Sequence, residues 1–352
     1  MADQQRIRVA AGGPLTDELV RRIVEREPRV EFLTDESLLP PQRHPGDHAG
    51  DPAFRRSPAQ ERRYDELLRS ADVLYGIPGE DPSRLRPVIE ANRSLRWVHT
   101  TPAGGGSQVK AARLSEEQLD RIAFTTSAGV HVEPLAEFSL FGLLAGLKTL
   151  PRLQEHQARH DWAAERWTMR LIGDANVLVV GLGHIGRTTA RKLALLGARV
   201  AGTSRRDVEV EGVGDVIHPD ALADRIGEFD GVVVTLPGTD QTRHLVGAEA
   251  LAAAKPGVVI VNVGRGSVID ESALVRELQG GRIGYAALDV VEQEPLDAGS
   301  PLWDMPNVLI SPHTAAMHER EDRLIADLFA ENATRFLDGR ELINRVNTVE
   351  FY

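Results

Sequence analysis

Residues 176–207, NVLVVGLGHIGRTTARKLALLGARVAGTSRRD, are the stretch of the chain that decides its fold. The run from Val177 to Val180 is apolar and mostly β-branched, which is typical of a buried parallel strand. The glycine sequence GLGHIG follows directly and opens a segment with helical periodicity, and a second short strand is expected at residues 199–203. This order of strand, glycine turn, helix and strand predicts a βαβ unit that binds a dinucleotide.

Each residue of the glycine turn has an expected task. Gly181 permits the tight turn, Gly183 lets the backbone approach a pyrophosphate, and Gly186 lets helix and strand pack closely. His184 and Ile185 begin the helix, whose free N–H groups attract the anion. The alternative, a tight turn in an ordinary loop, is disfavoured because a strand and a helix flank the motif on either side.

The end of the second strand indicates which dinucleotide binds. NAD-binding units usually carry an acidic residue about 20 positions after the glycine motif, and this residue hydrogen-bonds the ribose hydroxyls. Ser204 holds that position here, with Arg205 and Arg206 directly after it. A hydroxyl and two guanidinium groups would bind a 2′-phosphate through charge-assisted hydrogen bonds. We therefore expect NADP(H) to be preferred; NAD(H) stays possible, since both arginines could be solvated loop residues.

Length and composition set the broad class of the protein. A chain of 352 residues can form two domains, and its hydrophobic fraction of 42% and charged fraction of 26% are ordinary for a soluble protein. The absence of cysteine excludes disulfides, thiolate metal sites and thiol nucleophiles. A net charge of −11 argues against nucleic-acid binding, and no signal peptide or apolar run of membrane-spanning length is found. A cytoplasmic location is expected.

The part before residue 128 alternates strands and helices. Thr16 is a candidate N-cap for the helix at residues 17–26. Residues 39–57 are polar, rich in proline and glycine, and without periodicity, so we expect an inserted surface loop. Prolines exclude a helix there, so His44 and His48 are not expected to bind a metal. The expected elements are strands at 6–11, 30–33, 73–76, 95–99 and 122–126 and helices at 17–26, 65–70 and 87–92.

A glycine-rich segment follows the strand expected at residues 95–99. Ala103, Gly104 and Gly105 stand in the sequence TTPAGGGS. Successive glycines after a strand suggest a backbone that comes close to a small ligand, with N–H groups free for an anion such as a substrate carboxylate. A flexible loop is an equally good interpretation of this stretch alone.

The second half continues the alternation of strands and helices around the glycine turn. A helix with Gly142 and Gly146 on one packing face is expected at 134–150, and a polar, aromatic arm or interface segment at 151–167. A long helix is expected at 317–337, with Leu324, Leu328 and Phe336 on its apolar side. The six strands at 177–180, 199–203, 231–236, 258–263, 285–289 and 308–311, with helices at 248–254 and 271–279, predict a doubly wound parallel sheet.

Three chemically active residues follow strands of this predicted sheet. Arg265 comes after the strand at 258–263, Glu294 after the strand ending at 289, and His313 after the strand at 308–311. Ligands bind beyond the carboxyl ends of strands in open α/β folds. An arginine, a carboxylate and a histidine beside a nicotinamide suit a hydride transfer that needs a carboxylate clamp and a proton donor.

With these motifs assembled, the chain resembles the D-isomer-specific 2-hydroxyacid dehydrogenases, the family of phosphoglycerate dehydrogenase and glyoxylate/hydroxypyruvate reductases. The motifs GLGHIG, LPGTDQT, NVGRGSVIDE, ALDVVEQEP and SPHT carry the resemblance, and residues before 129 match only in layout. The resemblance implies that Arg265 and His313 bind the substrate, that His313 is the acid/base, and that Glu294 pairs with it and favours its protonated form. It also implies cofactor contacts at Leu236, Pro237, Val263 and Asp289.

The family pattern further implies the domain organisation. A Rossmann nucleotide domain at residues 129–317 would be inserted into a discontinuous, flavodoxin-like substrate domain formed by 1–128 and 318–352, and the nucleotide domains would form a homodimer. The chain departs from the pattern in its GGGS segment, in Lys110 and in the insertion at 39–57. These departures concern the substrate rather than the reaction.

The expected activity is therefore NAD(P)-dependent reduction of a small 2-oxo acid to a 2-hydroxy acid. A different class of function stays open: a dinucleotide-sensing binding protein, because some members of this fold act as co-repressors. A formate dehydrogenase is disfavoured, because those relatives carry glutamine at the position of Glu294.

Overall fold

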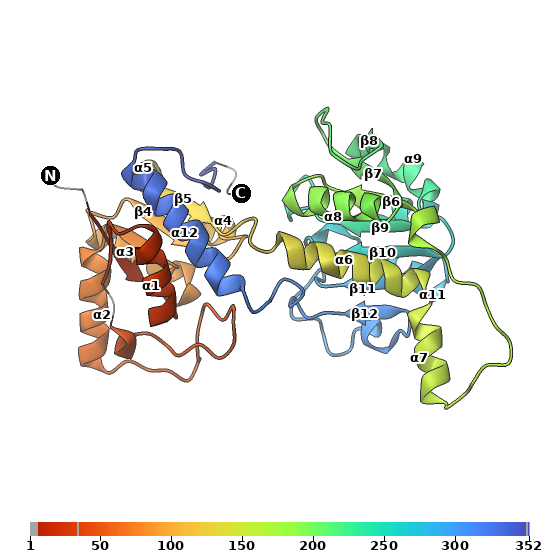
Figure 1. Ribbon diagram of the computed structural model, residues 1–352, viewed down its shortest axis with the longest axis horizontal. Helices are drawn as coiled ribbons and strands as arrows, with labels where there is room; N and C mark the ends of the chain where they lie inside the picture. The colour runs from red at the N-terminus through yellow and green to blue at the C-terminus, as the bar shows by residue number, and fades with distance from the viewer. Residues whose placement is uncertain (1–5, 34, 350, 352) are drawn as a thin grey trace. The chain divides into compact units, whose positions relative to one another are not determined.

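The computed structural model describes residues 6–33, 35–349 and 351. They form two compact units: the first contains the residues up to His131 and those from Met317 onward, and the second contains Val132–Ala316. Each unit is built on one parallel sheet with helices on its faces (Figure 1). The two parallel-sheet α/β domains expected from the sequence are thus confirmed. The assignment of residues 1–128 and 318–352 to substrate and 129–317 to dinucleotide stays a prediction.

The sheet of the first unit has the order β2-β1-β3-β4-β5. This is the flavodoxin-like order, in which the direction of winding changes between β1 and β3. Its strands are short and buried, and the carboxyl ends of all five lie on the same edge because every pairing is parallel. The strands are β1 (Ile7–Ala11), β2 (Val30–Phe32), β3 (Val73–Tyr75), β4 (Trp97–Thr100) and β5 (Ala123–Thr126).

The helices of the first unit cover both faces of this sheet. Phe329 of α12 stacks on Trp97 of β4 with ring centroids 4.8 Å apart, so the last helix packs into the core formed by the first strands. In the ribbon, α12 lies beside α1 (Figure 1). The helices are α1 (Asp17–Arg26), α2 (Pro58–Ser70), α3 (Pro82–Ala91), α4 (Gly106–Ala111), α5 (Glu116–Arg121) and α12 (Glu321–Leu337), with short 3₁₀ turns η1 (Glu36–Leu38) and η2 (Pro78–Glu80).

Local capping explains where the helix predictions for this unit were right and wrong. Thr16 caps α1 as predicted, accepting a hydrogen bond from the Leu19 N–H at 3.4 Å. The predicted start of α2 at residue 65 was wrong, because Ser57 and Gln60 form a capping box that begins the helix at Pro58. The predicted start of α3 at residue 87 was also wrong, since Asp81 caps the helix and Pro82 occupies its first turn.

The last helix also differs from its prediction. It begins at Glu321 rather than at residue 317, and Leu324, expected on the apolar side, is exposed. Ile325, Ala326 and Phe329 form the buried face instead. The buried face thus combines the large side chains of Ile325 and Phe329 with small ones such as Ala326, so the size of apolar residues alone did not mark it.

The sheet of the second unit has the order β12-β11-β10-β9-β6-β7-β8. This is a Rossmann order. The strands β7 and β8 lie on one side of β6, and the later strands β9 to β12 lie on its other side. The six predicted strands are all present, and β8 was missed because its three residues carry no apolar run. The strands are β6 (Asn176–Val180), β7 (Arg199–Thr203), β8 (Asp215–Ile217), β9 (Gly231–Val234), β10 (Val258–Asn262), β11 (Ile283–Leu288) and β12 (Val308–Ile310).

Close packing of α6 on this sheet depends on two glycines. A Cβ on Gly142 would lie 2.7 Å from the Ala287 Cβ, and one on Gly146 would lie 2.4 Å from Val259 Cγ2, so no larger residue fits. The helices of this unit are α6 (Val132–Leu147), α7 (Leu150–Ala158), α8 (His184–Leu195), α9 (Leu222–Arg225), α10 (Ala248–Ala253) and α11 (Glu271–Gln279). The 3₁₀ turns are η3 (Ile172–Asp174), η4 (Pro219–Ala221), η5 (Ile226–Glu228), η6 (Gly266–Val268) and η7 (Pro301–Asp304).

The helix predicted at 134–150 is divided in the structure. It ends at Leu147, and Thr149, at φ 53°, separates it from α7. Within the described parts of the chain, no helix combines the length and the apolar character needed to cross a membrane.

The insertion at residues 39–57 has no regular structure, as predicted, yet it is anchored to the start of α12. Asp322 Oδ1 accepts a hydrogen bond from the Gly46 N–H at 3.2 Å. Glu321 Oε1 lies 3.1 Å from His48 Nε2 and 2.9 Å from His131 Nε2. Glu321 is only 4% exposed, so its carboxylate depends on these two imidazoles for compensation.

These contacts predict that docking of the insertion depends on pH. Burial alone would raise the pKa of Glu321, but hydrogen bonds from His131 and His48 hold it at about 2. Burial also opposes charge on His48, yet the contact with Glu321 raises the pKa of His48 above its ordinary value. The stabilisation that protonated His48 gives is complete below its unfolded pKa of 6.5 and is lost as pH rises through the raised folded pKa. The stabilisation that ionised Glu321 gives is lost only as pH falls toward 2.

We therefore expect amide exchange in residues 40–56, corrected for intrinsic rates, to be severalfold less protected at pH 9 than at pH 6. His48→Gln should abolish most of this difference, because glutamine does not titrate. Protection that stays constant across this range would contradict the assigned charge on His48.

Candidate active site

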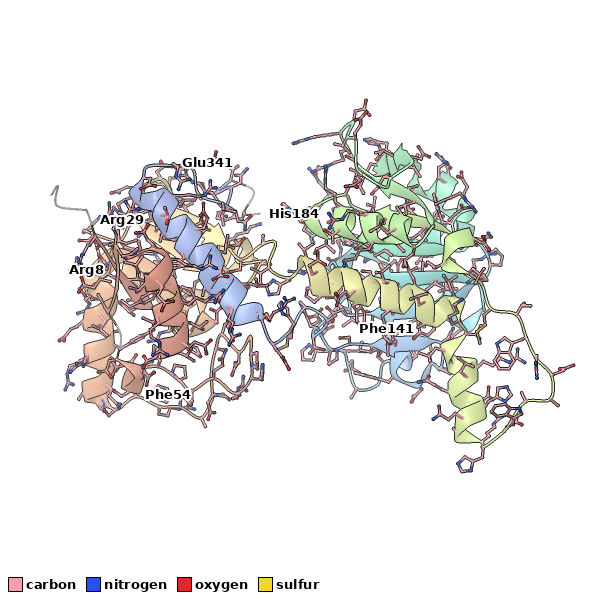
Figure 2. The ribbon with its side chains drawn as sticks, in the orientation of Figure 1. Arg8, Arg29, Phe54, Phe141, His184 and Glu341 are labelled. Carbon is pink, nitrogen blue, oxygen red and sulfur yellow. The ribbon has the colours of Figure 1, made fainter. Side chains whose placement is uncertain are left out.

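The glycine turn after β6 leaves open space at the N-terminus of α8. Gly181 has φ 104°, which only glycine adopts readily, and a Cβ on Gly186 would lie 1.9 Å from the Gly181 carbonyl oxygen. A Cβ on Gly183, by contrast, would meet nothing within 4 Å. His184 begins the helix at this point (Figure 2). The turn therefore fits a pyrophosphate on the first N–H groups of the helix.

Two threonines fix the conformation of the glycine turn. The Gly181 N–H donates to Thr203 Oγ1 at 3.0 Å, and Thr235 Oγ1 donates to the Gly181 carbonyl oxygen at 2.8 Å. These residues end β7 and follow β9, so neighbouring strands hold the turn from either side. Sequence reasoning missed both, because no local pattern marks a threonine that bonds across a sheet.

The end of β7 carries two arginines without carboxylate partners. Ser204 Oγ accepts a hydrogen bond from the Arg206 N–H at 3.1 Å, which closes a short turn after the strand. Arg205 bonds the neutral side chain of Gln241. Among the residues that the structure describes, no acidic group pairs with Arg205 or Arg206, and both are exposed. Two uncompensated cations therefore stand where a ribose 2′ substituent is expected.

The loop after β10 presents Arg265 on a tightly packed backbone. A Cβ on Gly264 would lie 2.5 Å from the Leu236 carbonyl oxygen, and one on Gly266 would lie 1.9 Å from the Val291 carbonyl carbon. Buried Asn262 accepts a bond from the Gly264 N–H at 3.1 Å and donates to the Arg265 carbonyl oxygen at 3.1 Å. The glycines of the GRG sequence are thus required by packing, and Asn262 is a positioning residue that the sequence analysis did not identify.

The guanidinium group of Arg265 is free for a ligand. Its only hydrogen bond among the described residues is to the carbonyl oxygen of neighbouring Gly264, at 2.8 Å, and the residue is exposed. An arginine with no carboxylate partner can form the bidentate contact that a substrate carboxylate offers. Arg265 was predicted in this role from its place after a strand.

Glu294 and His313 are brought together by neighbouring strands. In the sheet, Asn262 of β10 pairs with Leu288 of β11, and Leu288 pairs with Ile310 of β12, so the three strand ends are in register. His313 Nδ1 lies 2.7 Å from Glu294 Oε2. The histidine side chain is 49% exposed, and its hydrogen bond among the described residues uses Nδ1, which leaves Nε2 without a protein partner there.

The backbone at His313 is held in an uncommon conformation. Its φ is 56°, in the left-handed region, and its N–H donates to the Asp289 carbonyl oxygen at 2.9 Å. Buried Asp289 also accepts hydrogen bonds at one carboxylate oxygen from the Thr314 N–H at 3.0 Å and the Ala315 N–H at 2.9 Å. The side chain and carbonyl of Asp289 therefore shape the loop that presents His313.

The remaining expected cofactor residues lie along the same edge of the sheet. Leu236 is half-buried and touches the space beside Gly181, Pro237 is exposed, and Val263 is buried at the end of β10. Their contacts with a cofactor, and that of Asp289, stay predictions.

Ala103, Gly104 and Gly105 lie beyond β4 in the first unit, whereas Arg265, Glu294 and His313 lie in the second. The segment was expected either to approach a small ligand or to be a flexible loop, and α4 begins directly after it at Gly106. Gly105 packs against Thr100, where a Cβ would lie 1.7 Å from Oγ1. The structure therefore gives Gly105 a packing role; contact of Ala103, Gly104 and Gly105 with substrate stays a prediction. No cluster of acidic or histidine side chains suited to a metal ion occurs among residues 6–33, 35–349 and 351.

The sequence is similar to a family model and to characterised relatives. Residues 140–315 match the model of the NAD-binding domain of D-isomer-specific 2-hydroxyacid dehydrogenases. A glyoxylate reductase of Korarchaeum cryptofilum is 32% identical over 299 residues, covering 83% of this chain and 87% of the relative.

Solved structures of similar chains cover nearly the whole molecule. A D-isomer-specific 2-hydroxyacid dehydrogenase of Xanthobacter autotrophicus, in complex with NADPH and MES, has a TM-score of 0.76 at 27% identity and covers 99% of this chain and 100% of its own. An NADPH-dependent glyoxylate/hydroxypyruvate reductase of Sinorhizobium meliloti, in complex with NADP and sulfate, has a TM-score of 0.76 at 25% identity with the same coverage.

Proposed function

The chain belongs to the D-isomer-specific 2-hydroxyacid dehydrogenase family, and we propose that it reduces a small 2-oxo acid such as glyoxylate or hydroxypyruvate with NADPH. It is an oxidoreductase of the CH–OH group that uses a nicotinamide cofactor. The observation that carries the proposal is the His313–Glu294 pair at 2.7 Å, beside the unpaired Arg265 on the neighbouring strand end. The glyoxylate reductase from Korarchaeum and the glyoxylate/hydroxypyruvate reductase from Sinorhizobium support the substrate class.

In the proposed mechanism, the guanidinium group of Arg265 binds the carboxylate of the 2-oxo acid and orients its carbonyl group. Glu294 holds Nδ1 of His313, which leaves Nε2 to carry the reacting proton. A nicotinamide bound at the end of this sheet would supply the hydride for C2 of the acid. As negative charge develops on the carbonyl oxygen, His313 gives it the Nε2 proton, so the product is a 2-hydroxy acid.

The residues present fit the dinucleotide. Gly181, Gly183 and Gly186 give the pyrophosphate access to the start of α8, as the open space at Gly183 indicates. Arg205 and Arg206 would hold a 2′-phosphate, which supports NADPH over NADH.

Oxidation of NADPH and of NADH by the purified protein, against 2-oxo acids from glyoxylate and hydroxypyruvate to phenylpyruvate, tests the proposal. Turnover of a small 2-oxo acid with faster use of NADPH is expected. Binding of both coenzymes without turnover of any acid would overturn the proposed reaction and favour a dinucleotide-sensing protein.

Ser204→Asp should reverse the coenzyme preference. A carboxylate there would repel a 2′-phosphate and accept hydrogen bonds from a free ribose 2′-hydroxyl. The loss of one charge-assisted interaction corresponds to a rise in KM for NADPH of roughly tenfold to a hundredfold. The ratio of kcat/KM for NADPH and NADH measures the effect, with Ser204→Ala as the uncharged control. An unchanged ratio in Ser204→Asp would show that this strand end does not contact the 2′ position.

A homodimer through the second unit is also proposed. The helix α7 has no buried residue, and with the segment after it extends away from the sheet (Figure 1). Trp162 is 95% exposed on that segment, and Phe141 is exposed on α6 (Figure 2). Exposed aromatic side chains on an extended arm are typical of a surface that a second copy covers. A monomer in sedimentation analysis would contradict the dimer.

A further inference from the structure

Glu80 joins two loops at the carboxyl edge of the first sheet. It stands in η2, directly after β3, and one of its carboxylate oxygens accepts a hydrogen bond from Thr101 Oγ1 at 2.8 Å. The other accepts a hydrogen bond from Gln108 Nε2, also at 2.8 Å. Both oxygens of this half-buried carboxylate are therefore used within the first unit, and both partners belong to the segment that follows β4.

The backbone around Glu80 is held in a conformation that directs its side chain to that segment. Gly79 and Glu80 both have positive φ, 66° and 54°, and the second value is uncommon for a residue other than glycine. The Gly79 N–H donates to the Gly12 carbonyl oxygen at 2.8 Å, and the Glu80 N–H donates to the Ile77 carbonyl oxygen at 2.9 Å. The hydrogen bond to Gly12, directly after β1, thus holds the turn from which the Glu80 side chain reaches the segment after β4.

The segment that Glu80 holds contains the three residues that are expected to contact substrate. Thr101 and Gln108 lie on either side of Ala103, Gly104 and Gly105. The internal backbone bonds of this segment join near neighbours, such as Gly105 N–H to the Pro102 oxygen at 3.2 Å. Gly105 packs against Thr100, whereas Ala103 is exposed and Gly104 is half-buried, so packing holds only one side of the segment. The carboxylate of Glu80 adds a fixed point at each end.

The surroundings of Gly76 show that the segments after β1, β3 and β4 meet at the carboxyl edge of the sheet. A Cβ on Gly76 would lie 3.8 Å from Glu80 Oε1, from the Gly13 amide nitrogen and from Thr101 Cγ2. The residues after β1, β3 and β4 therefore meet at one place. In open α/β sheets, this edge is where ligands bind.

We propose that Glu80 is a positioning residue for substrate binding, which holds the segment from Thr101 to Gln108 in the conformation that receives the 2-oxo acid. The inference rests on the proposed function, because it assigns substrate contact to Ala103, Gly104 and Gly105. It adds a residue that belongs neither to those three positions nor to the set of Arg265, Glu294 and His313. A positioning role predicts a change in KM for the acid, with kcat and coenzyme binding preserved.

Four variants test this role. Glu80→Ala removes both hydrogen bonds and should raise KM for the 2-oxo acid about tenfold, with kcat and the Kd of NADPH within about twofold of the wild-type values. The exchange Glu80→Gln with Gln108→Glu reverses donor and acceptor between the two side chains and should restore KM. Glu80→Gln alone keeps the bond from Thr101, and Gln108 can turn its unpartnered oxygen to accept from the new amide; a neutral bond then replaces a charge-assisted one, so an intermediate KM is expected. Glu90→Ala removes an exposed acid of the same unit and serves as the matched control.

Amide exchange of residues 101–108 is measured in parallel, because it reports the position of the segment without requiring turnover. Faster exchange in Glu80→Ala, restored in the double variant together with KM, would support the proposal. Unchanged exchange, or faster exchange with unchanged KM for an acid that the wild type reduces, would overturn it. If the wild type reduces no acid, the proposed function fails, and the exchange result alone decides whether Glu80 holds the segment.

Discussion

His313→Ala should lower kcat for 2-oxo acid reduction by about 10²- to 10⁴-fold while the affinity for NADPH stays unchanged. The substitution removes the imidazole that gives its Nε2 proton to the carbonyl oxygen, and it leaves Glu294 with the Val291 N–H, at 3.4 Å, as its remaining partner. The loop itself should persist, because Asp289 holds it through the backbone N–H groups of His313, Thr314 and Ala315. The loss is therefore expected in the chemical step and not in the fold.

The measurement combines steady-state kcat with a fluorescence titration of NADPH. Alanine at φ 56° carries some backbone strain, so His313→Asn, a residue that tolerates this region, provides a second variant with the same expected loss. His218→Ala is the matched control, since His218 also pairs with a carboxylate of the second unit, Asp220 at 3.3 Å. Near-normal turnover in both His313 variants would show that another group supplies the proton.

The parts of the molecule that the sequence predicted well have short-range physical causes. The turn follows from local steric limits at two glycines: Gly181 has φ 104°, and a Cβ on Gly186 would lie 1.9 Å from the Gly181 carbonyl oxygen, whereas the position of Gly183 is open. The same holds for α1 and α11, whose starts follow capping side chains at Thr16 and Asp270. The positions of Arg265, Glu294 and His313 could be predicted because parallel strands end at one edge of a sheet.

What the sequence did not reveal depends on contacts between distant segments. Asn262, Thr203 and Asp289 act through hydrogen bonds to loops that only the folded sheet brings near them. Glu80 was overlooked for the same reason, since its partners Thr101 and Gln108 lie more than twenty residues along the chain, and the glycine pattern between them does not indicate a carboxylate partner. The β8 strand was missed because only Ile217 of its three residues is buried, and the strand conformation comes from pairing with β7 rather than from apolar periodicity.

Arg265→Ala should lower kcat/KM for 2-oxo acids by about 10²- to 10⁴-fold, mainly through a higher KM. A bidentate contact to a carboxylate consists of two charge-assisted hydrogen bonds, each worth about 1.5–3 kcal/mol, and both are lost. Since the Arg265 guanidinium has no acidic partner among the described residues, its removal leaves no unpaired charge in the protein, so stability should change little. Steady-state kinetics with glyoxylate and a thermal unfolding curve measure the two effects.

The two-point geometry of the Arg265 guanidinium predicts an order of kcat/KM among further variants. Arg265→Lys keeps the charge but offers a single point of contact, so its kcat/KM should lie between those of the wild type and Arg265→Ala. Added guanidinium should partly restore the activity of Arg265→Ala, because Gly264 and Gly266 keep the loop packed while the side chain is missing. The exposed Arg276 of α11 gives the control, Arg276→Ala, which removes a cation from the same unit. Equal activity in Arg265→Ala and Arg276→Ala would exclude a carboxylate clamp at this strand end, whereas lowered stability and weaker NADPH binding in Arg265→Ala alone would indicate a structural role.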